Sequence, residues 1–286
     1  MFADTNNSAS LEQGDWSPER WFEHGRTSEA EGRFPEAERA YRESLAQGEP
    51  VAERFYRLGC VLRKASRISE AADSFEQAVK VDPGSARYWT NLGAALDDLG
   101  RPGEAEKAYG RAIRAGGEVW QAQNNLGALY ADQGRTREAL RCFEAAIETR
   151  PDAEGFLNIG LVHFHAADFE QALERFEQAS SLEPDHAVAH YHAALTLHKK
   201  GVSREALARF RRALQLDARL VRSHFYMGTC LHHLGRFDDA LTSLRRALDH
   251  WPDDARVHYQ TALTLDALEL HQEARRHYRL ARGEGS

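Results

Sequence analysis

Apolar residues follow a helical period that is interrupted at regular intervals along the chain. Residues 52–85 contain two apolar stripes with helical spacing, separated by a polar turn and followed by Pro83. The stripes are Phe55, Leu58 and Leu62, then Ala71, Phe75 and Ala78. The same pattern returns along the chain at a nearly constant interval of about 34 residues. The repetition predicts a stack of similar helical hairpins, each of which packs on its neighbours.

Small residues occupy two places in every repeat when Pro18 is taken as the first place. The eighth place holds glycine or alanine: Gly25, Gly59, Gly93, Gly127, Gly160, Ala194, Gly228 and Ala262. The twentieth place is always alanine: Ala37, Ala71, Ala105, Ala139, Ala172, Ala206, Ala240 and Ala274. A small side chain lets the paired helix approach closely, so both places are expected inside the hairpins.

These places divide the chain into eight antiparallel helical hairpins and define an all-α fold. The predicted repeats are 18–51, 52–85, 86–119, 120–152, 153–186, 187–220, 221–254 and 255–286. Ser17 and Pro18 form a helix start, because serine caps the first turn and proline fits its first position. Residues 1–17 are polar and lack a period, so we expect a disordered tail before a single array at 18–286.

A hairpin of about 34 residues with this signature resembles the tetratricopeptide repeat, and the resemblance covers residues 18–286. It implies a right-handed α-solenoid, in which the chain coils into a superhelix. It also implies that the first helix of each repeat lines a concave groove. Proteins of this family are interaction scaffolds, so the resemblance implies an adaptor that binds an extended segment of a partner protein.

Composition narrows the location and excludes several kinds of chemistry. No apolar run is long enough to span a membrane, and the first residues lack the basic and apolar regions of a signal peptide. Three separated cysteines predict free thiols and a cytoplasmic protein. The sequence contains no phosphate loop, dinucleotide fingerprint, HExxH motif or nucleophile motif. We therefore expect neither enzymatic activity nor a cofactor.

Charge is distributed unevenly. Residues 187–286 contain 16 Lys and Arg against 11 Asp and Glu, whereas the remainder contains 21 against 33. Arg211, Arg245 and Arg279 recur at the repeat interval on the expected second helices. Such a stripe is open to an acidic protein, nucleic acid, an anionic membrane or solvent alone. The net charge of −7 disfavours nucleic acid as a partner.

Two columns of side chains are candidates for peptide binding. Asn91, Asn125 and Asn158 occupy the sixth place of successive repeats. By resemblance, this asparagine ladder faces the groove, where carboxamides hydrogen-bond a peptide backbone. Tyr191, Phe225 and Tyr259 occupy the fifth place and would hold apolar, proline or arginine side chains. Both columns are also open to a structural interpretation, in which they support packing of the repeats.

A third column, His198, His232 and Asp266, contains acceptable zinc ligands at the repeat interval. Structural zinc sites usually have tight paired spacings, so the sequence favours no metal and a solvated or pH-sensitive rim. Two alternatives to a simple adaptor stay open: a sensor whose histidine-rich end responds to metal or pH, and a targeting module for a separate enzyme such as a glycosyltransferase. No solvating helix follows the last hairpin, so weak self-association through that end is a further expectation.

Overall fold

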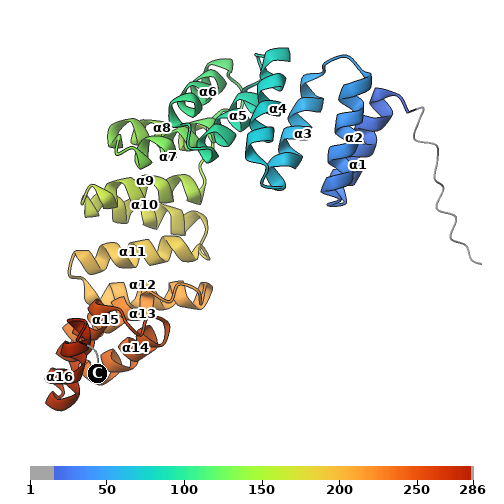
Figure 1. The fold of residues 1–286 in the computed structure, drawn as a ribbon. Helices are drawn as coiled ribbons and strands as arrows, with labels where there is room; N and C mark the ends of the chain where they lie inside the picture. The colour runs from blue at the N-terminus through green and yellow to red at the C-terminus, as the bar shows by residue number, and fades with distance from the viewer. Residues whose placement is uncertain (1–15, 285–286) are drawn as a thin grey trace, which may run out of the picture. The chain divides into compact units, whose positions relative to one another are not determined.

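The computed structural model describes residues 16–284, and helices joined by turns and short loops make up this range (Figure 1). Most of the predicted tail, residues 1–15, lies outside the described residues. The all-α class and the paired helical hairpins are confirmed. The first six helices are α1 (Pro18–Ala30), α2 (Phe34–Gln47), α3 (Ala52–Lys64), α4 (Ile68–Val81), α5 (Ala86–Asp98) and α6 (Pro102–Ala115). The next six are α7 (Trp120–Asp132), α8 (Thr136–Thr149), α9 (Ala153–His165), α10 (Phe169–Leu182), α11 (Ala187–Lys199) and α12 (Ser203–Leu216). The last four are α13 (Ser223–His233), α14 (Phe237–His250), α15 (Ala255–Ala267) and α16 (His271–Ala281).

Each hairpin turns through a residue in the left-handed backbone region. Gly32, Gly100, Gly134, Gly201 and Gly235 occupy this place with φ between 68° and 78°. Glycine is suited to the turn because it has no Cβ to clash in this conformation. Ser66, Ala167 and Glu269 occupy the same place with φ of 60° or 61°. The turn geometry is therefore common to all eight repeats, including the three in which the side chain opposes it.

Close packing inside the hairpins explains the small residues of the eighth and twentieth places. A Cβ added to Gly160 would lie 2.6 Å from a ring carbon of Phe176, and one added to Gly59 would lie 2.6 Å from Phe75. The alanines of the twentieth place are fully buried, as Ala139 illustrates. In these hairpins the first helix thus rests directly on an aromatic ring of the second, and the close approach is the one that the small residues predict.

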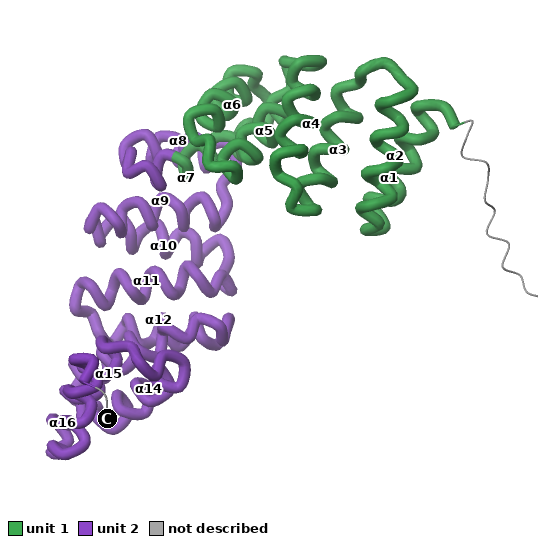
Figure 2. Tube along the Cα trace, in the orientation of Figure 1, with its two compact units in different colours: residues 1–129 green, residues 130–286 purple. Residues whose placement is uncertain are grey.

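The chain divides into two compact units (Figure 2). Unit 1 ends at Leu129, and unit 2 begins at Tyr130. In unit 1, α1 to α6 pack in chain order, each helix against the next. In unit 2, α8 to α16 pack in the same way, and α11 also contacts α13, which contacts α15. The prediction of a single array over 18–286 remains a prediction.

Helix α13 departs from the pattern of the other first helices. It begins at Ser223 rather than at the expected first place, Val221, since residues 221–222 form a turn. The resulting segment brings Arg222 ahead of the helix, at the edge of unit 2 where the side chains described below gather.

The last hairpin is partly covered by its own residues. Leu265 is only 1% exposed and packs with Leu241 and Ala274, while Leu268 is half-buried against this cluster. Self-association through this end remains a prediction. None of the helices described between residues 16 and 284 is long and apolar enough to cross a membrane.

Candidate functional site

An open hollow in unit 2 is lined by side chains of α13, α15 and α16. We call it the aromatic hollow, and its lining residues are Phe225, Ala255, Arg256, Tyr259, Gln260, Tyr278, Ala281 and Arg282. Tyr259 is 53% exposed, whereas Phe225 is half-buried against Leu244 and Val257. Apolar ring faces beside two arginines suit a peptide that has apolar and acidic side chains.

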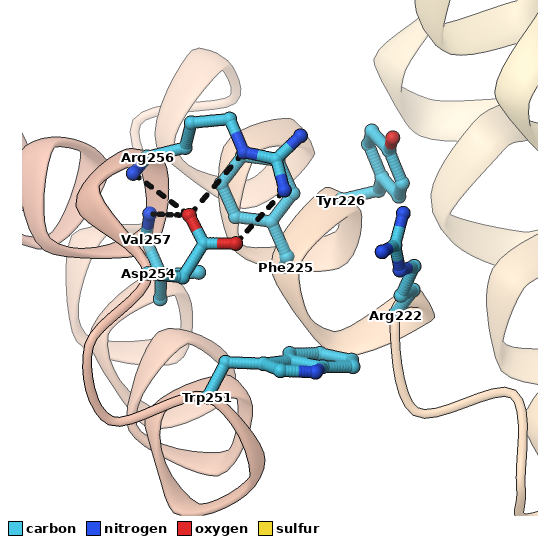
Figure 3. A pocket seen from close by; sticks show the side chains of 7 residues that line it. All are labelled: Arg222, Phe225, Tyr226, Trp251, Asp254, Arg256 and Val257. Atoms are coloured by element: carbon cyan, nitrogen blue, oxygen red, sulfur yellow. Dashed lines mark hydrogen bonds and ion pairs between the residues drawn. The ribbon is translucent and has the colours of Figure 1, made fainter.

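A smaller pocket adjoins the aromatic hollow and shares Phe225 and Arg256 with it (Figure 3). Figure 3 shows Arg222 between the rings of Trp251 and Tyr226, with its guanidinium carbon 5.9 Å from the Trp251 ring centroid. This distance is within the range of a cation–π interaction. The ring and the guanidinium therefore form one wall of the pocket.

Asp254 fixes both the start of α15 and the position of Arg256. Its carboxylate accepts hydrogen bonds from the backbone N–H groups of Arg256 and Val257, at 2.8 and 3.4 Å. The same carboxylate accepts two bonds from the Arg256 guanidinium, at 3.2 and 2.8 Å. The Arg256 side chain and these backbone bonds lower the pKa of Asp254 to about 2. The site thus holds Arg256 in one orientation over a wide pH range.

Tyr278 is held by a contact across the last hairpin. Its hydroxyl donates to a carboxylate oxygen of Asp266 at 2.9 Å, and its ring lies edge-on to Tyr259 with centroids 5.9 Å apart. Burial, together with this hydrogen bond, raises the pKa of Tyr278 to about 12. The phenol therefore remains neutral, and Tyr278 is a fixed wall against which the exposed Tyr259 rests.

The structure separates the predicted aromatic column into two environments. Phe225 and Tyr259 line the same hollow, as the column predicts. Tyr191 instead packs on the core of α11 and α12, edge-on to Phe210 at 5.9 Å, and burial raises the pKa of Tyr191 to about 12. Packing accounts for Tyr191, whereas nothing in the core requires the exposed ring of Tyr259.

The asparagine ladder is engaged in contacts within the chain. The Asn91 carboxamide donates to the backbone carbonyl of Arg87 at 2.9 Å. Asn125 is hydrogen-bonded to the Tyr109 side chain, and Asn158 also has an interaction partner in the protein. Its role in binding a peptide remains a prediction.

The sixth place continues beyond the ladder with side chains that the sequence analysis did not single out. His192 stacks on Phe176 with ring centroids 5.5 Å apart, and Tyr226 stacks on Phe210 at 5.6 Å. In each case the partner belongs to the preceding repeat, as does Tyr109 for Asn125. The sixth place therefore joins consecutive hairpins, and the repeat interval was the signal that linked these positions.

The proposed metal ligands have different neighbours. The Nδ1 atom of His198 lies 3.6 Å from the Cys230 sulfur, and Nδ1 of His232 lies 3.1 Å from the Thr264 hydroxyl. Asp266 pairs with His271 at 3.1 Å. No group of three or more His, Cys, Asp or Glu side chains suited to a metal occurs within residues 16–284. Cys60, Cys142 and Cys230 form no disulfide bond among the described residues.

The sequence analysis missed Arg256 of the aromatic hollow, as well as Arg222 and Trp251 of the adjoining pocket. Arg222 and Arg256 occupy the second place of successive repeats, so the repeat interval could have indicated them. Trp251 precedes Pro252 at the end of a second helix, where an aromatic residue has no place in the repeat pattern. Only the folded hairpins bring Trp251 and Tyr278 to the same edge of unit 2.

Together, the stacked hairpins define the class of the protein, which is an α-helical repeat protein. The chain belongs to the tetratricopeptide repeat family. The model of that family matches six overlapping segments, residues 56–118, 93–154, 124–172, 157–220, 199–242 and 233–286. This fold is a protein–protein interaction scaffold and is typically a non-catalytic module.

Solved structures of tetratricopeptide proteins have the same fold. YrrB, described as a TPR protein with an unusual peptide-binding site, is 21% identical with a TM-score of 0.57, over 65% of this chain and 96% of its own. The PilF protein of Pseudomonas aeruginosa is 20% identical with a TM-score of 0.64, over 72% and 94%. A repeat protein from Cytophaga hutchinsonii is 14% identical with a TM-score of 0.67, over 86% and 99%. The comparison with curated proteins found no relative.

Proposed function

We propose that this protein is a non-enzymatic adaptor that binds an extended segment of a partner protein in the aromatic hollow of unit 2. The observation that carries the proposal is the exposed Tyr259 ring, which lies beside Phe225 and the fixed Tyr278. An apolar side chain of the partner would cover these rings, and Arg256 and Arg282 would contact its carboxylates or backbone carbonyls. The surface is already formed, so binding requires little reorganisation.

The peptide-binding site named for YrrB supports the choice of ligand, although its similarity to this chain extends only to the fold. The asparagine ladder is a second element of the same hypothesis, since a carboxamide that donates to its own helix retains its oxygen as an acceptor. Partner identity would then depend on the hollow, and the ladder would contribute backbone contacts that tolerate many sequences. A cytoplasmic location accords with the free thiols and is part of the proposal.

A peptide-display selection tests the proposed function. Peptides selected on the full-length protein should bind the wild type and lose about tenfold or more in affinity for Tyr259→Ala, because truncating a central aromatic contact typically costs over ~1 kcal/mol. Leu182→Ala is the matched control, since Leu182 is a large exposed apolar residue outside the hollow. Equal binding to the wild type and to both variants would place the site elsewhere. Circular dichroism would confirm that the variants are folded.

A second candidate function is pH sensing by the histidine-rich end. The Nδ1 atoms of His258 and His277 lie 2.9 Å apart, and Nε2 of His258 lies 2.7 Å from the Pro252 carbonyl oxygen. Such a pair needs one neutral ring, because two protonated rings would repel. Burial lowers the pKa of His277, and the positive charges of His258, Arg276 and Arg245 add to the effect against Glu273.

Both rings of this pair belong to α15 and α16, the helices that line much of the aromatic hollow. Acidification would therefore disturb the hollow, and the affinity of a selected peptide should fall as the pH drops below the range in which histidine ordinarily titrates, because the pKa of His277 is lowered. His277→Gln should reduce this pH dependence. An unchanged pH dependence in that variant would exclude the pair as the sensor.

A further inference from the structure

The second helices of the last three hairpins expose a row of arginines outside the aromatic hollow. Arg211 on α12, Arg245 on α14 and Arg279 on α16 recur at the same place of successive repeats, and all three are exposed. More exposed arginines accompany them on the same helices: Arg212, Arg246, Arg275 and Arg276. None of the seven lines the hollow. We call these seven residues the arginine face.

Most of this positive charge is not neutralised by the protein. At the starts of other second helices, arginines pair with acids three residues further on: Arg33 with Glu36, Arg67 with Glu70, Arg101 with Glu104, and Arg135 with Glu138. On the arginine face, Arg212 pairs with Asp185. The other six have no ion-pair partner anywhere in residues 16–284. Six guanidinium groups with free donors are therefore available to an external anion.

The arginines of α14 and α16 lower the pKa values of two neighbouring histidines. Burial lowers the pKa of His224 on α13, and the charges of Arg246 and His250 lower it further. Arg245 and Arg276 act in the same direction on the pKa of His277 of α16. The positive charge of α14 thus reaches side chains on α13 and α16.

The same scaffold place varies in charge in the earlier repeats. It is glutamate on α4, α8 and α10, as Glu76, Glu144 and Glu177, glycine on α6, and on α2 it is Arg42, which pairs with Glu38 and Glu70. A place that only keeps the outer surface solvated accepts either sign. The change to arginine in three consecutive repeats gives the last part of the chain a distinct surface with the same packing beneath it.

We propose that the arginine face is a docking surface for an acidic, Asp- and Glu-rich segment of a partner protein, separate from the aromatic hollow. Arginine binds carboxylates through two parallel hydrogen bonds, and a flexible acidic segment can follow arginines spaced one repeat apart. Nucleic acid fits less well. No exposed Phe, Tyr or Trp ring on α12, α14 or α16, among the residues described, offers a stacking platform for bases.

Fluorescence anisotropy with a labelled oligoglutamate peptide tests this docking surface on the full chain. The wild type should bind the peptide with an affinity that falls as salt is added. The variant R211E/R245E/R279E should lose about tenfold or more, because reversing three charges replaces attraction with repulsion. It should remain folded, since glutamate already occupies this place in Glu76, Glu144 and Glu177.

A control variant, R39E/R63E/R114E, changes the net charge by the same amount at exposed arginines of unit 1. It should retain affinity within about threefold, as expected when only the net charge of the protein changes. Equal losses in both variants, or no peptide binding at low salt, would overturn the proposal. Tighter binding of a single-stranded oligonucleotide of equal charge would overturn the choice of occupant. Tyr259→Ala should leave oligoglutamate binding intact, which distinguishes this site from the aromatic hollow.

Discussion

Helices α10 and α12 each bury a phenylalanine ring at the same place of the repeat, but the exposed residues that follow these rings have opposite charges. Phe176 and Phe210 are both fully buried, and each stacks on a sixth-place ring of the next repeat. The residue that follows is Glu177 in α10 and Arg211 in α12, and both are exposed. The difference teaches that the interior places set the hairpin, while the exterior place next to them is free to carry a binding function.

The strongest test of this separation replaces the two rings. Phe176→Ala and Phe210→Ala should each lower the free energy of unfolding by about 3–5 kcal/mol, since each removes a fully buried ring and leaves a cavity. Urea unfolding followed by circular dichroism measures both losses. The two losses should be similar although the neighbouring charges differ.

The exterior places provide the matched controls. Glu177→Arg and Arg211→Glu should each change the free energy of unfolding by less than about 0.5 kcal/mol, as exposed substitutions usually do. A loss in Arg211→Glu comparable with that in Phe210→Ala would show that the charge supports the fold. The arginine face would then need a structural explanation in place of a functional one.

The sixth-place residue that stacks on Phe176 of α10 is His192, a histidine that can bind a proton in acid. The one that stacks on Phe210 of α12 is Tyr226, which does not. Burial, with the charge of His165, lowers the pKa of His192 to about 4. The unfolded chain binds a proton near the ordinary pKa of about 6.5, so it binds more protons than the folded chain between these values. The stability that the neutral ring provides is therefore complete above a pH of about 6.5 and is lost as the pH falls towards about 4. At a pH of about 5 the loss should be on the order of 2 kcal/mol.

His192→Asn should remove this contribution, because it installs the neutral residue that Asn91, Asn125 and Asn158 provide at the same place. Chemical denaturation at neutral and at mildly acidic pH would measure the difference for wild type and variant. His233→Asn, which changes an exposed histidine, should keep the pH dependence of the wild type. If His192→Asn kept it too, the buried ring would not be its source.

Asn125 sharpens the question of what the ladder does. Asn125→Ala should lower the free energy of unfolding by about 1 kcal/mol, because it leaves the hydroxyl of Tyr109, a residue only 1% exposed, without this hydrogen bond. Asn91→Ala should cost less, since Asn91 bonds only to the carbonyl of its own helix among the hydrogen bonds described for it.

A double-mutant cycle with Tyr109→Phe separates the contact from other effects. Coupling between the two substitutions is expected from the hydrogen bond. Strictly additive losses would show that the hydrogen bond contributes nothing to stability. Peptide binding would then be the remaining role for Asn125.

The repeat register could be predicted from sequence because close packing leaves few choices at the eighth and twentieth places. Gly160 and Ala139 must be small whatever protein the chain binds, so the recurrence of small residues at the repeat interval reveals them. The aromatic hollow could be predicted only in part. Phe225 and Tyr259 recur at the repeat interval, whereas the contribution of Trp251 to the adjoining pocket depends on where the end of α14 places its ring. The repeat interval shows which places recur but not how exposed each side chain is. The sequence therefore could not distinguish the packed Tyr191 from the exposed Tyr259, which share the fifth place.

The hairpin turns carry the smallest predicted effect on stability, which can be tested by adding glycine to one turn and removing it from another. Ala167 has a φ of 60°, a conformation that costs an ordinary side chain about 1–2 kcal/mol. Ala167→Gly should raise the free energy of unfolding by about 0.5–1 kcal/mol, since relief of strain exceeds the entropy that glycine adds to the unfolded chain. Gly134→Ala, at the same place with a φ of 71°, should lower it by a similar amount. If both substitutions shifted stability in the same direction, backbone strain would not govern this turn, and the side-chain surroundings of each repeat would decide instead.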